Sequence, residues 1–169
     1  MNSPYEGKFR ITQRFKGAAH DGLDLVGIDS KDIHATATGV VQYAGWENAN
    51  VPTQGFGQYV CIKSSDNKFY YYGHLSKITV KTGQNVKITD IIGVEGSTGN
   101  STGSHCHYCV RPKFAAGSYL DVNAISGIPN IEGGVYDDGY RTGSGKEKKT
   151  VKVTMTIDDH QYSGLLEEM

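Results

Sequence analysis

Two histidines in one short stretch, His105 and His107, are the residues of this sequence best placed to do chemistry together. They follow a glycine-rich, polar loop at 96–104 and open a segment of β-branched and aromatic residues, which favours a strand. Side chains two residues apart in a strand leave on the same face, so both imidazoles would point the same way. One of them can bind a metal while the other carries a proton, and the pair alone does not say which does what.

Upstream, His20 and Asp24 are four residues apart, with Gly22 between them. In an extended segment this even spacing puts both side chains on one face, and the glycine lets another group approach the backbone closely. With His107 they would form a set of two histidines and one carboxylate, which leaves the fourth tetrahedral position of a zinc ion for water. That pattern is typical of catalytic zinc rather than structural zinc.

Each of these motifs is weak when taken alone. H-x-G-x-D more often marks a turn, and H-x-H is a surface coincidence about as often as it is a site. Their joint presence, with His74 at the end of an aromatic run, favours a site.

The composition predicts a turn-rich β protein and argues against several partners. The 169 residues include 22 glycines and 11 tyrosines, which suits short strands joined by turns. Lys and Arg total 17 against 18 for Asp and Glu, so no strong field for nucleic acid is expected. No apolar run reaches membrane-spanning length. The first residues also lack the charged start and apolar stretch of a secretory signal, so we expect a chain that does not export itself.

Alternating or β-rich runs predict strands at 9–15, 38–46, 58–63 and 68–74, the last two joined by a turn at 64–67. Short strands continue toward His105, and no segment has a convincing helical period. The sequence therefore predicts an all-β, antiparallel domain.

Three segments divide the chain. Residues 1–131 form the predicted β domain, and residues 132–150 read as a polar, glycine-punctuated linker. Strict alternation beyond it predicts a C-terminal β-hairpin over 151–169. A lone hairpin is marginally stable in water, so we expect this one to pack on something.

The three cysteines favour packing roles. Their odd number argues against a full disulfide framework. Cys106 and Cys109 are three apart on the predicted strand, so they face opposite sides and do not converge. Cys109 shares the face of His105 and His107 and would lie near a metal, but burial as a small hydrophobe is the favoured interpretation.

Other polar residues also receive structural interpretations. His34 is expected to be half-buried, Asp121 to cap or turn the chain, and His160 to lie in the turn of the tail. Asp21 should face away from its two ligand neighbours and be solvated.

Taken together, several segments resemble the lysostaphin-type (LytM-like) zinc peptidases that cut peptidoglycan cross-links. The matching segments are ITQRF…HDGLDL at 11–25, TGVVQYAGW at 38–46, YYYGHLSKI at 70–78, GQNVKITDIIGVEGSTGNSTGSHCHYCVR at 83–111 and YLDV at 119–122. They lie in order over residues 9–125. The resemblance implies antiparallel sheets with a groove over a bound zinc ion (Zn2+).

Residue by residue, the resemblance implies that His20, Asp24 and His107 bind zinc, and that His74 and His105 are the catalytic pair. Cys106 and Cys109 stand where the family usually has an apolar and an acidic residue, in H-L-H-F-E-V-R. No glutamate lies in an H-E-x-x-H context, so an imidazole must move the proton. His105 is the expected general base and His74 the expected partner of the oxyanion or the leaving amine, and the sequence is equally compatible with an exchange of these two roles.

The expected function is a zinc endopeptidase that hydrolyses peptide bonds of bacterial peptidoglycan, in the stem peptide or the cross-bridge, with a metal-activated water. Loops 47–57 and 112–118 would set specificity. Without an export signal, the chain resembles a phage or prophage lysin acting at the cell wall, virion-associated or released by phage lysis. Its hairpin would bind a tail assembly or mediate self-association. The alternative is a non-catalytic LytM-like binding or regulatory module of a virion or cell-wall complex; a structural zinc protein is disfavoured because the predicted site keeps an open position.

Overall fold

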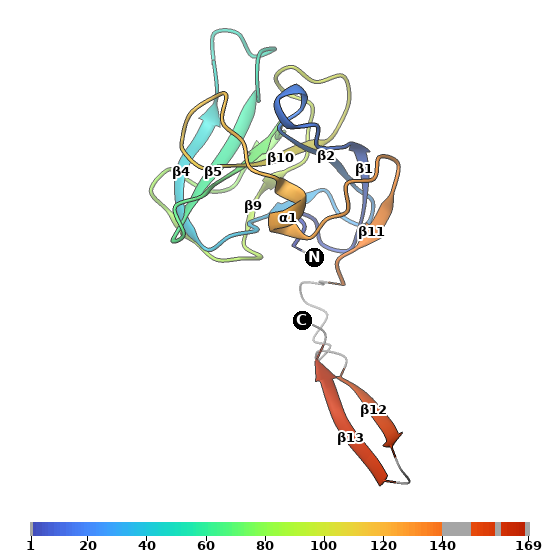
Figure 1. The fold of residues 1–169 in the computed structure, drawn as a ribbon. Helices are drawn as coiled ribbons and strands as arrows, with labels where there is room; N and C mark the ends of the chain where they lie inside the picture. The colour runs from blue at the N-terminus through green and yellow to red at the C-terminus, as the bar shows by residue number, and fades with distance from the viewer. Residues whose placement is uncertain (1, 140–149, 158–159, 168–169) are drawn as a thin grey trace.

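A computed structural model describes residues 2–139, 150–157 and 160–167 of the chain (Figure 1). Its main sheet has eight strands in the order β11-β1-β2-β10-β6-β5-β4-β8, and every neighbouring pair is antiparallel. The bounds are β1 (Lys8–Gln13), β2 (Gly22–Gly27), β4 (Gly39–Trp46), β5 (Gln58–Ser64), β6 (Phe69–Gly73), β8 (Asn85–Val86), β10 (Cys106–Arg111) and β11 (Val135–Asp137). The predicted antiparallel all-β class is confirmed.

Smaller elements complete the described part of the chain. A second sheet joins β3 (Asp32–His34), β9 (Ile91–Val94) and β7 (Lys77–Ile78). The predicted C-terminal hairpin is present as β12 (Thr150–Ile157) and β13 (His160–Glu167), paired along their whole length. Within the described residues, the helical elements are a 3-10 turn, η1 (Gly17–Ala19), and a short helix, α1 (Val122–Ser126). No helix in the described ranges has the length and apolarity needed to cross a bilayer.

The central strands are buried on both faces, and alternation divides their side chains between two clusters. Leu23 and Leu25 of β2 and Tyr108 of β10 point into the main core. On the other face, Cys109 packs with Tyr71 and other aromatic side chains in a smaller cluster. Because strand neighbours leave on opposite sides, Asp24 and His107 also lie on this second face. Packing in the main core thus holds β2 and β10 in place, and the opposite face of the sheet carries Asp24 and His107.

Two short elements differ from the expectations. Val135–Asp137 was expected to belong to the linker, but it forms β11 and pairs with the outer edge of β1. Three residues among glycines and aspartates are too few to show a strand period. Helix α1 was likewise too short to predict. Asp121 caps it as expected, accepting from the backbone N–H groups of residues 123 and 124. Within the expected linker, residues 140–149 lie outside the described residues.

The three cysteines are buried as expected, and His34 is buried more fully than the expected half-burial. Cys61, Cys106 and Cys109 are free thiols, all buried. Cys106 lies in the main core and Cys109 in the second cluster, so the two do not converge. Burial raises the pKa of Cys61 to about 12 and that of Cys106 well above its usual value. His34 is also buried, and its Nδ1 lies 2.8 Å from the Thr89 carbonyl oxygen.

Candidate metal centre

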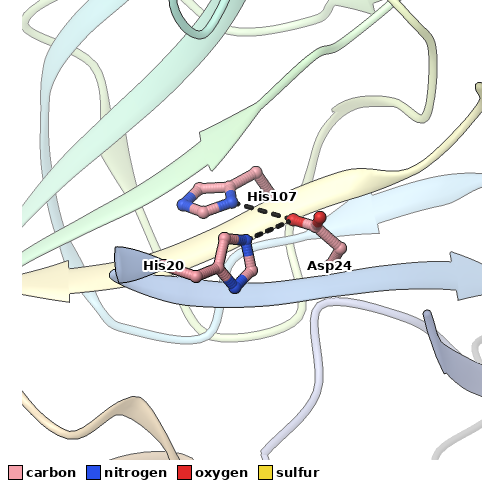
Figure 2. A group of neighbouring side chains, drawn as sticks. All are labelled: His20, Asp24 and His107. Carbon is pink, nitrogen blue, oxygen red and sulfur yellow. Dashed lines mark hydrogen bonds and ion pairs between the residues drawn. The ribbon is translucent and has the colours of Figure 1, made fainter. Parts of the chain in front are cut away.

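Asp24 and His107 meet across the β2–β10 pair. They are directly opposite each other in the strand register, and Asp24 Oδ1 lies 2.8 Å from His107 Nδ1 (Figure 2). His20 follows η1 and has an extended backbone, which carries its ring toward the same carboxylate. Its Nε2 lies 3.1 Å from Asp24 Oδ1. The structure thus brings together the three residues that the sequence predicts as metal ligands.

Gly22 makes room for this arrangement, as its place between His20 and Asp24 predicts. A Cβ at residue 22 would lie 2.7 Å from His107 Nε2 and 2.6 Å from the Tyr108 carbonyl oxygen. The imidazole of His107 therefore lies directly over the bare backbone of the neighbouring strand, where no larger residue fits.

His74 and His105 lie beside the three-residue cluster. Their ring centroids are 4.6 Å apart, and His105 Nε2 is 3.6 Å from Asp24 Oδ1. His74 follows the last residue of β6, and its φ of 63° is a left-handed conformation that costs about 1 kcal/mol or more for a residue with a side chain. Its backbone N–H donates to the Phe56 carbonyl at 2.8 Å, which holds the strained residue in place.

Main-chain carbonyls set the tautomers of three of these histidines. The Nδ1 atoms of His20, His74 and His105 lie 2.7–2.8 Å from the carbonyl oxygens of residues 14, 98 and 103. A carbonyl can only accept, so Nδ1 carries the hydrogen in each neutral ring and Nε2 presents its lone pair to the centre. His107 is oriented differently, because both of its ring nitrogens face carboxylates.

The donor set fits a zinc ion. One oxygen or nitrogen from each of His20, Asp24 and His107 lies within 4.8 Å of the other two. Tetrahedral zinc ligands at ordinary bond lengths are about 3.3 Å apart, close to the separations seen here. The His20 lone pair also faces a carboxylate oxygen, and two acceptors at 3.1 Å repel unless a cation or a proton lies between them. Two imidazoles and a carboxylate leave a fourth position open, as in catalytic zinc sites.

The charges of the cluster follow from its hydrogen bonds. Burial opposes ionisation of Asp24, but hydrogen bonds from His107 and His20 outweigh it and hold the pKa of this carboxyl well below its usual range. Burial also disfavours a charge on His107, yet the two carboxylates beside it raise its pKa well above 6.5. Burial lowers the pKa of His74 to about 4. At neutral pH the site therefore offers an anionic carboxylate and an uncharged His74.

Asp21 is a correction to the sequence-based expectation. It was expected to face away and be solvated, but its Oδ1 lies 3.2 Å from His107 Nε2 and its Oδ2 pairs with Arg111 at 2.8 Å. Residue 21 precedes the start of β2 at Gly22, so strand alternation does not govern its direction. The sequence does contain a signal for this contact. Arg111 lies four residues after His107, so both side chains leave the strand on the same face.

Phe56 is a second contact that the sequence did not indicate. It lies in the loop before β5, and its ring centroid is 5.5 Å from that of His107. A single aromatic residue in a glycine-rich loop carries no periodic signal. It forms an apolar wall beside the histidines.

These features define a class: an antiparallel β domain whose sheet carries an open His–Asp–His centre, flanked by two further histidines. Comparison with known proteins gives the family. Residues 18–121, more than half of the chain, match the model of Peptidase family M23. The chain belongs to that family.

Two solved structures illustrate the similarity. The catalytic domain of lysostaphin from Staphylococcus simulans is 29% identical, with a TM-score of 0.58, over 73% of this chain and 93% of that one. A mutant catalytic domain of the prophage-encoded M23 protein EnpA from Enterococcus faecalis is 32% identical, with a TM-score of 0.55, over 72% and 91%.

Among curated relatives, the peptidoglycan DD-endopeptidase ShyA of Vibrio cholerae is 31% identical over 141 residues, which is 76% of this chain and 31% of the relative. An uncharacterized metalloprotease of Buchnera aphidicola is 35% identical over 118 residues, 64% of this chain and 30% of the relative. This chain thus spans less than a third of the length of these relatives.

Proposed function

We propose that this protein is a zinc-dependent endopeptidase that hydrolyses peptide bonds of bacterial peptidoglycan. The observation that carries the proposal is the convergence of His20, Asp24 and His107 around an open position, with His74 and His105 beside it. Membership of Peptidase family M23 supports peptide hydrolysis. The name of a similar protein, the peptidoglycan DD-endopeptidase ShyA, supports peptidoglycan as the substrate.

His20, Asp24 and His107 are the proposed ligands of the zinc ion. When bound there, zinc polarises a peptide carbonyl and lowers the pKa of water to about 7. The protein must then accept a proton from water and deliver one to the leaving amine. The two remaining imidazoles, His74 and His105, are the proposed proton carriers, since an imidazole can both accept and donate a proton through its ring nitrogens.

His105 is the proposed general base. Its Nδ1–H donates to the Gly103 carbonyl, so its free Nε2 points toward Asp24 and the metal position. His74 is held in the same tautomer by Thr98 and stays uncharged because of its low pKa. Because its Nε2 carries no hydrogen in this tautomer, His74 is proposed to take up a proton there first and, once protonated, to stabilise the developing oxyanion or pass that proton to the leaving amine. Under these two assignments, the proton leaves the water and reaches the amine through the neighbouring imidazoles of His105 and His74.

Digestion of purified cell walls tests the proposal. The wild-type protein should release new amino groups, lose this activity with a chelator and recover it when zinc is added. An Asp24→Ala variant should be inactive under all three conditions. Binding to walls without any release of amino groups, in a zinc-loaded wild-type protein, would refute the enzyme and favour a binding module.

A second measurement on such digests identifies the scissile bond. Mass spectrometry of the released muropeptides from walls of different cross-bridge types should show one recurring pair of new ends. Cuts in the stem peptide and cuts in the cross-bridge give products of different mass.

A phage or prophage origin, with action from a virion or after phage lysis, is a further proposal. Its support is a similar structure, 32% identical, that belongs to a prophage-encoded protein. The hairpin β12–β13 is proposed to bind a tail assembly or a second copy of the chain. Mass spectrometry of purified virions tests the first role, and the oligomeric state of the full chain, compared with a chain ending at residue 139, tests the second.

A further inference from the structure

The ring of His107 lies between two carboxylates. Its Nδ1 is 2.8 Å from Asp24 Oδ1, and its Nε2 is 3.2 Å from Asp21 Oδ1. The side chain is only 8% exposed, so water does not compete freely for either nitrogen. Asp24 belongs to the proposed ligand set, and Asp21 lies on the opposite side of the ring.

Asp21 is itself held in place from the far side. Its Oδ2 accepts hydrogen bonds from Arg111 Nε at 3.2 Å and from Arg111 Nη2 at 2.8 Å. The guanidinium carbon of Arg111 lies 5.1 Å from the ring centroid of Phe56 and 4.7 Å from that of Tyr71. Contacts with aromatic faces and two bonds to one carboxylate leave this arginine few alternative positions. Asp21 thus has one oxygen fixed by Arg111 and the other directed at His107.

The strand register explains how these groups meet. His107, Cys109 and Arg111 leave β10 on the same face, and Gly22 of β2 lies opposite Cys109. Because Gly22 has no side chain and Cys109 is small, the carboxylate of the preceding Asp21 reaches both His107 and Arg111.

We propose that Asp21 is a positioning residue that, held by Arg111, fixes the orientation and tautomer of His107 for metal binding. With its Nε2–H donated to Asp21, His107 presents its Nδ1 lone pair to the position shared with His20 and Asp24. A carboxylate behind a metal-bound histidine increases the basicity of the ring and typically improves metal affinity 10- to 100-fold. The inference rests on the metal site of the proposed function and adds a residue to it.

A second cation is the rival explanation for the same atoms. Donor atoms of Asp21, His107 and Cys109 also lie within 4.8 Å of one another. The Arg111 guanidinium, however, already supplies the positive charge at Asp21, and it would repel a metal ion placed there. The geometry therefore favours a hydrogen bond at His107 Nε2.

Zinc titration of the full chain against a chromogenic chelator tests the inference. We expect one zinc ion per wild-type chain, a 10- to 100-fold weaker affinity in Asp21→Ala and a smaller loss in Asp21→Asn, which keeps one acceptor oxygen. Asp66→Asn is the matched control, since it removes an equal charge at the turn between β5 and β6 and should leave the affinity unchanged. Nitrogen-15 NMR of the zinc-loaded chain should show His107 Nε2–H in the wild type, exchanging faster with solvent in both Asp21 variants.

The outcomes distinguish a failure of the proposed function from a failure of this inference. A wild-type chain that binds no zinc overturns both the proposed function and this inference. A wild type that binds zinc, with unchanged affinity and unchanged Nε2–H exchange in the Asp21 variants, overturns the inference alone, even if those variants are less stable. Two zinc ions per chain, one of them lost in Cys109→Ala, also overturn it. Asp21→Asn has nearly the shape of the native residue, so it serves if Asp21→Ala does not fold.

Discussion

Asp24 and His107 occupy opposed positions of two antiparallel strands, and their side chains meet at 2.8 Å. The same register that packs Leu23 and Leu25 into the main core therefore brings together two of the three proposed metal ligands. A slip of one residue between β2 and β10 would turn Asp24 or His107 into the core and break both arrangements at once. The pairing of β2 with β10 therefore forms the core and the site together.

Substitutions should separate metal binding from proton transfer. We expect His20→Ala and Asp24→Ala to lose stoichiometric zinc, because each removes one of three protein ligands. His74→Ala and His105→Ala should retain zinc but lower kcat for wall cleavage about 10²- to 10⁴-fold, the usual contribution of a general acid or base. Elemental analysis after gel filtration and amino-group release measure the two effects. Full zinc occupancy in the first pair, or wild-type turnover in the second, would contradict the assignment.

Gly22→Ala should damage both stability and the metal centre. The added methyl group would lie 2.6 Å from a backbone oxygen and 2.7 Å from His107 Nε2, so β2 and β10 must move apart. We expect a loss of about 1–3 kcal/mol in the free energy of unfolding, as for other overpacked sites, together with weaker zinc binding. Urea denaturation and zinc titration check these effects.

Gly103→Ala is the control for this substitution. It lies in the loop before His105, but a Cβ at that position meets nothing within 4 Å. Its stability and zinc affinity should match those of the wild type. Equal effects at both glycines would show that the close approach at Gly22 is not the cause.

Glu95 should be important for stability although it is not in the proposed site. Its side chain is fully buried and accepts hydrogen bonds from Lys31, Ser104, Tyr5 and the Gly27 backbone N–H. Glu95→Ala leaves these donors without their acceptor, so we expect the free energy of unfolding to fall by about 3 kcal/mol or more. Hydrogen exchange should also quicken in the loop that leads to His105, since Ser104 loses its anchor.

Glu132→Ala gives the comparison for Glu95. Its carboxylate lies 3.8 Å from Lys16, and its side chain is 51% exposed. An exposed pair of this kind contributes little, so its removal should change stability by no more than about 0.5 kcal/mol. Similar losses for the two glutamates in denaturant titrations would refute the special role of the buried one.

The low pKa of His74 predicts a pH dependence of stability in the zinc-free protein. Burial lowers this pKa from 6.5 to about 4, so between these values the unfolded chain binds a proton that the folded chain does not. The contribution to stability is complete above about pH 6.5 and is lost as the pH falls toward 4, by up to about 3 kcal/mol. A His74→Gln variant should lack this component, and its stability curve should be flatter over that range. Parallel curves for variant and wild type would contradict the burial argument.

Much of the architecture was predictable from the sequence because local signals agreed with the final fold. The runs around Val41, Val60 and Tyr71 have β-forming residues between clear turns, and all became strands of the main sheet. Even spacing of His20 and Asp24 around Gly22 indicated a shared face with room for a close approach, and the distances agree.

The remaining features depend on contacts that periodicity does not describe. Asp21 lies just outside β2, where the chain leaves η1, and its direction is set by Arg111, some ninety residues away. Phe56 reaches His107 from a loop, and β11 becomes a strand because the edge of β1 is available to pair with it. Long-range partners, not intrinsic propensity, decide such positions.

The use of main-chain carbonyls to orient His20, His74 and His105 gives the proposed chemistry a tolerance to mutation. A side-chain acceptor is lost when its residue changes, whereas the carbonyls of Arg14, Thr98 and Gly103 persist whichever side chain those positions carry. The loops can therefore accumulate substitutions that change the side chains and the charge around the histidines without changing which nitrogen bears the hydrogen. Under the proposed function, substrate preference and proton transfer would then be separable. A library that varies loop side chains while keeping the backbone path should alter substrate preference without changing the set of histidines.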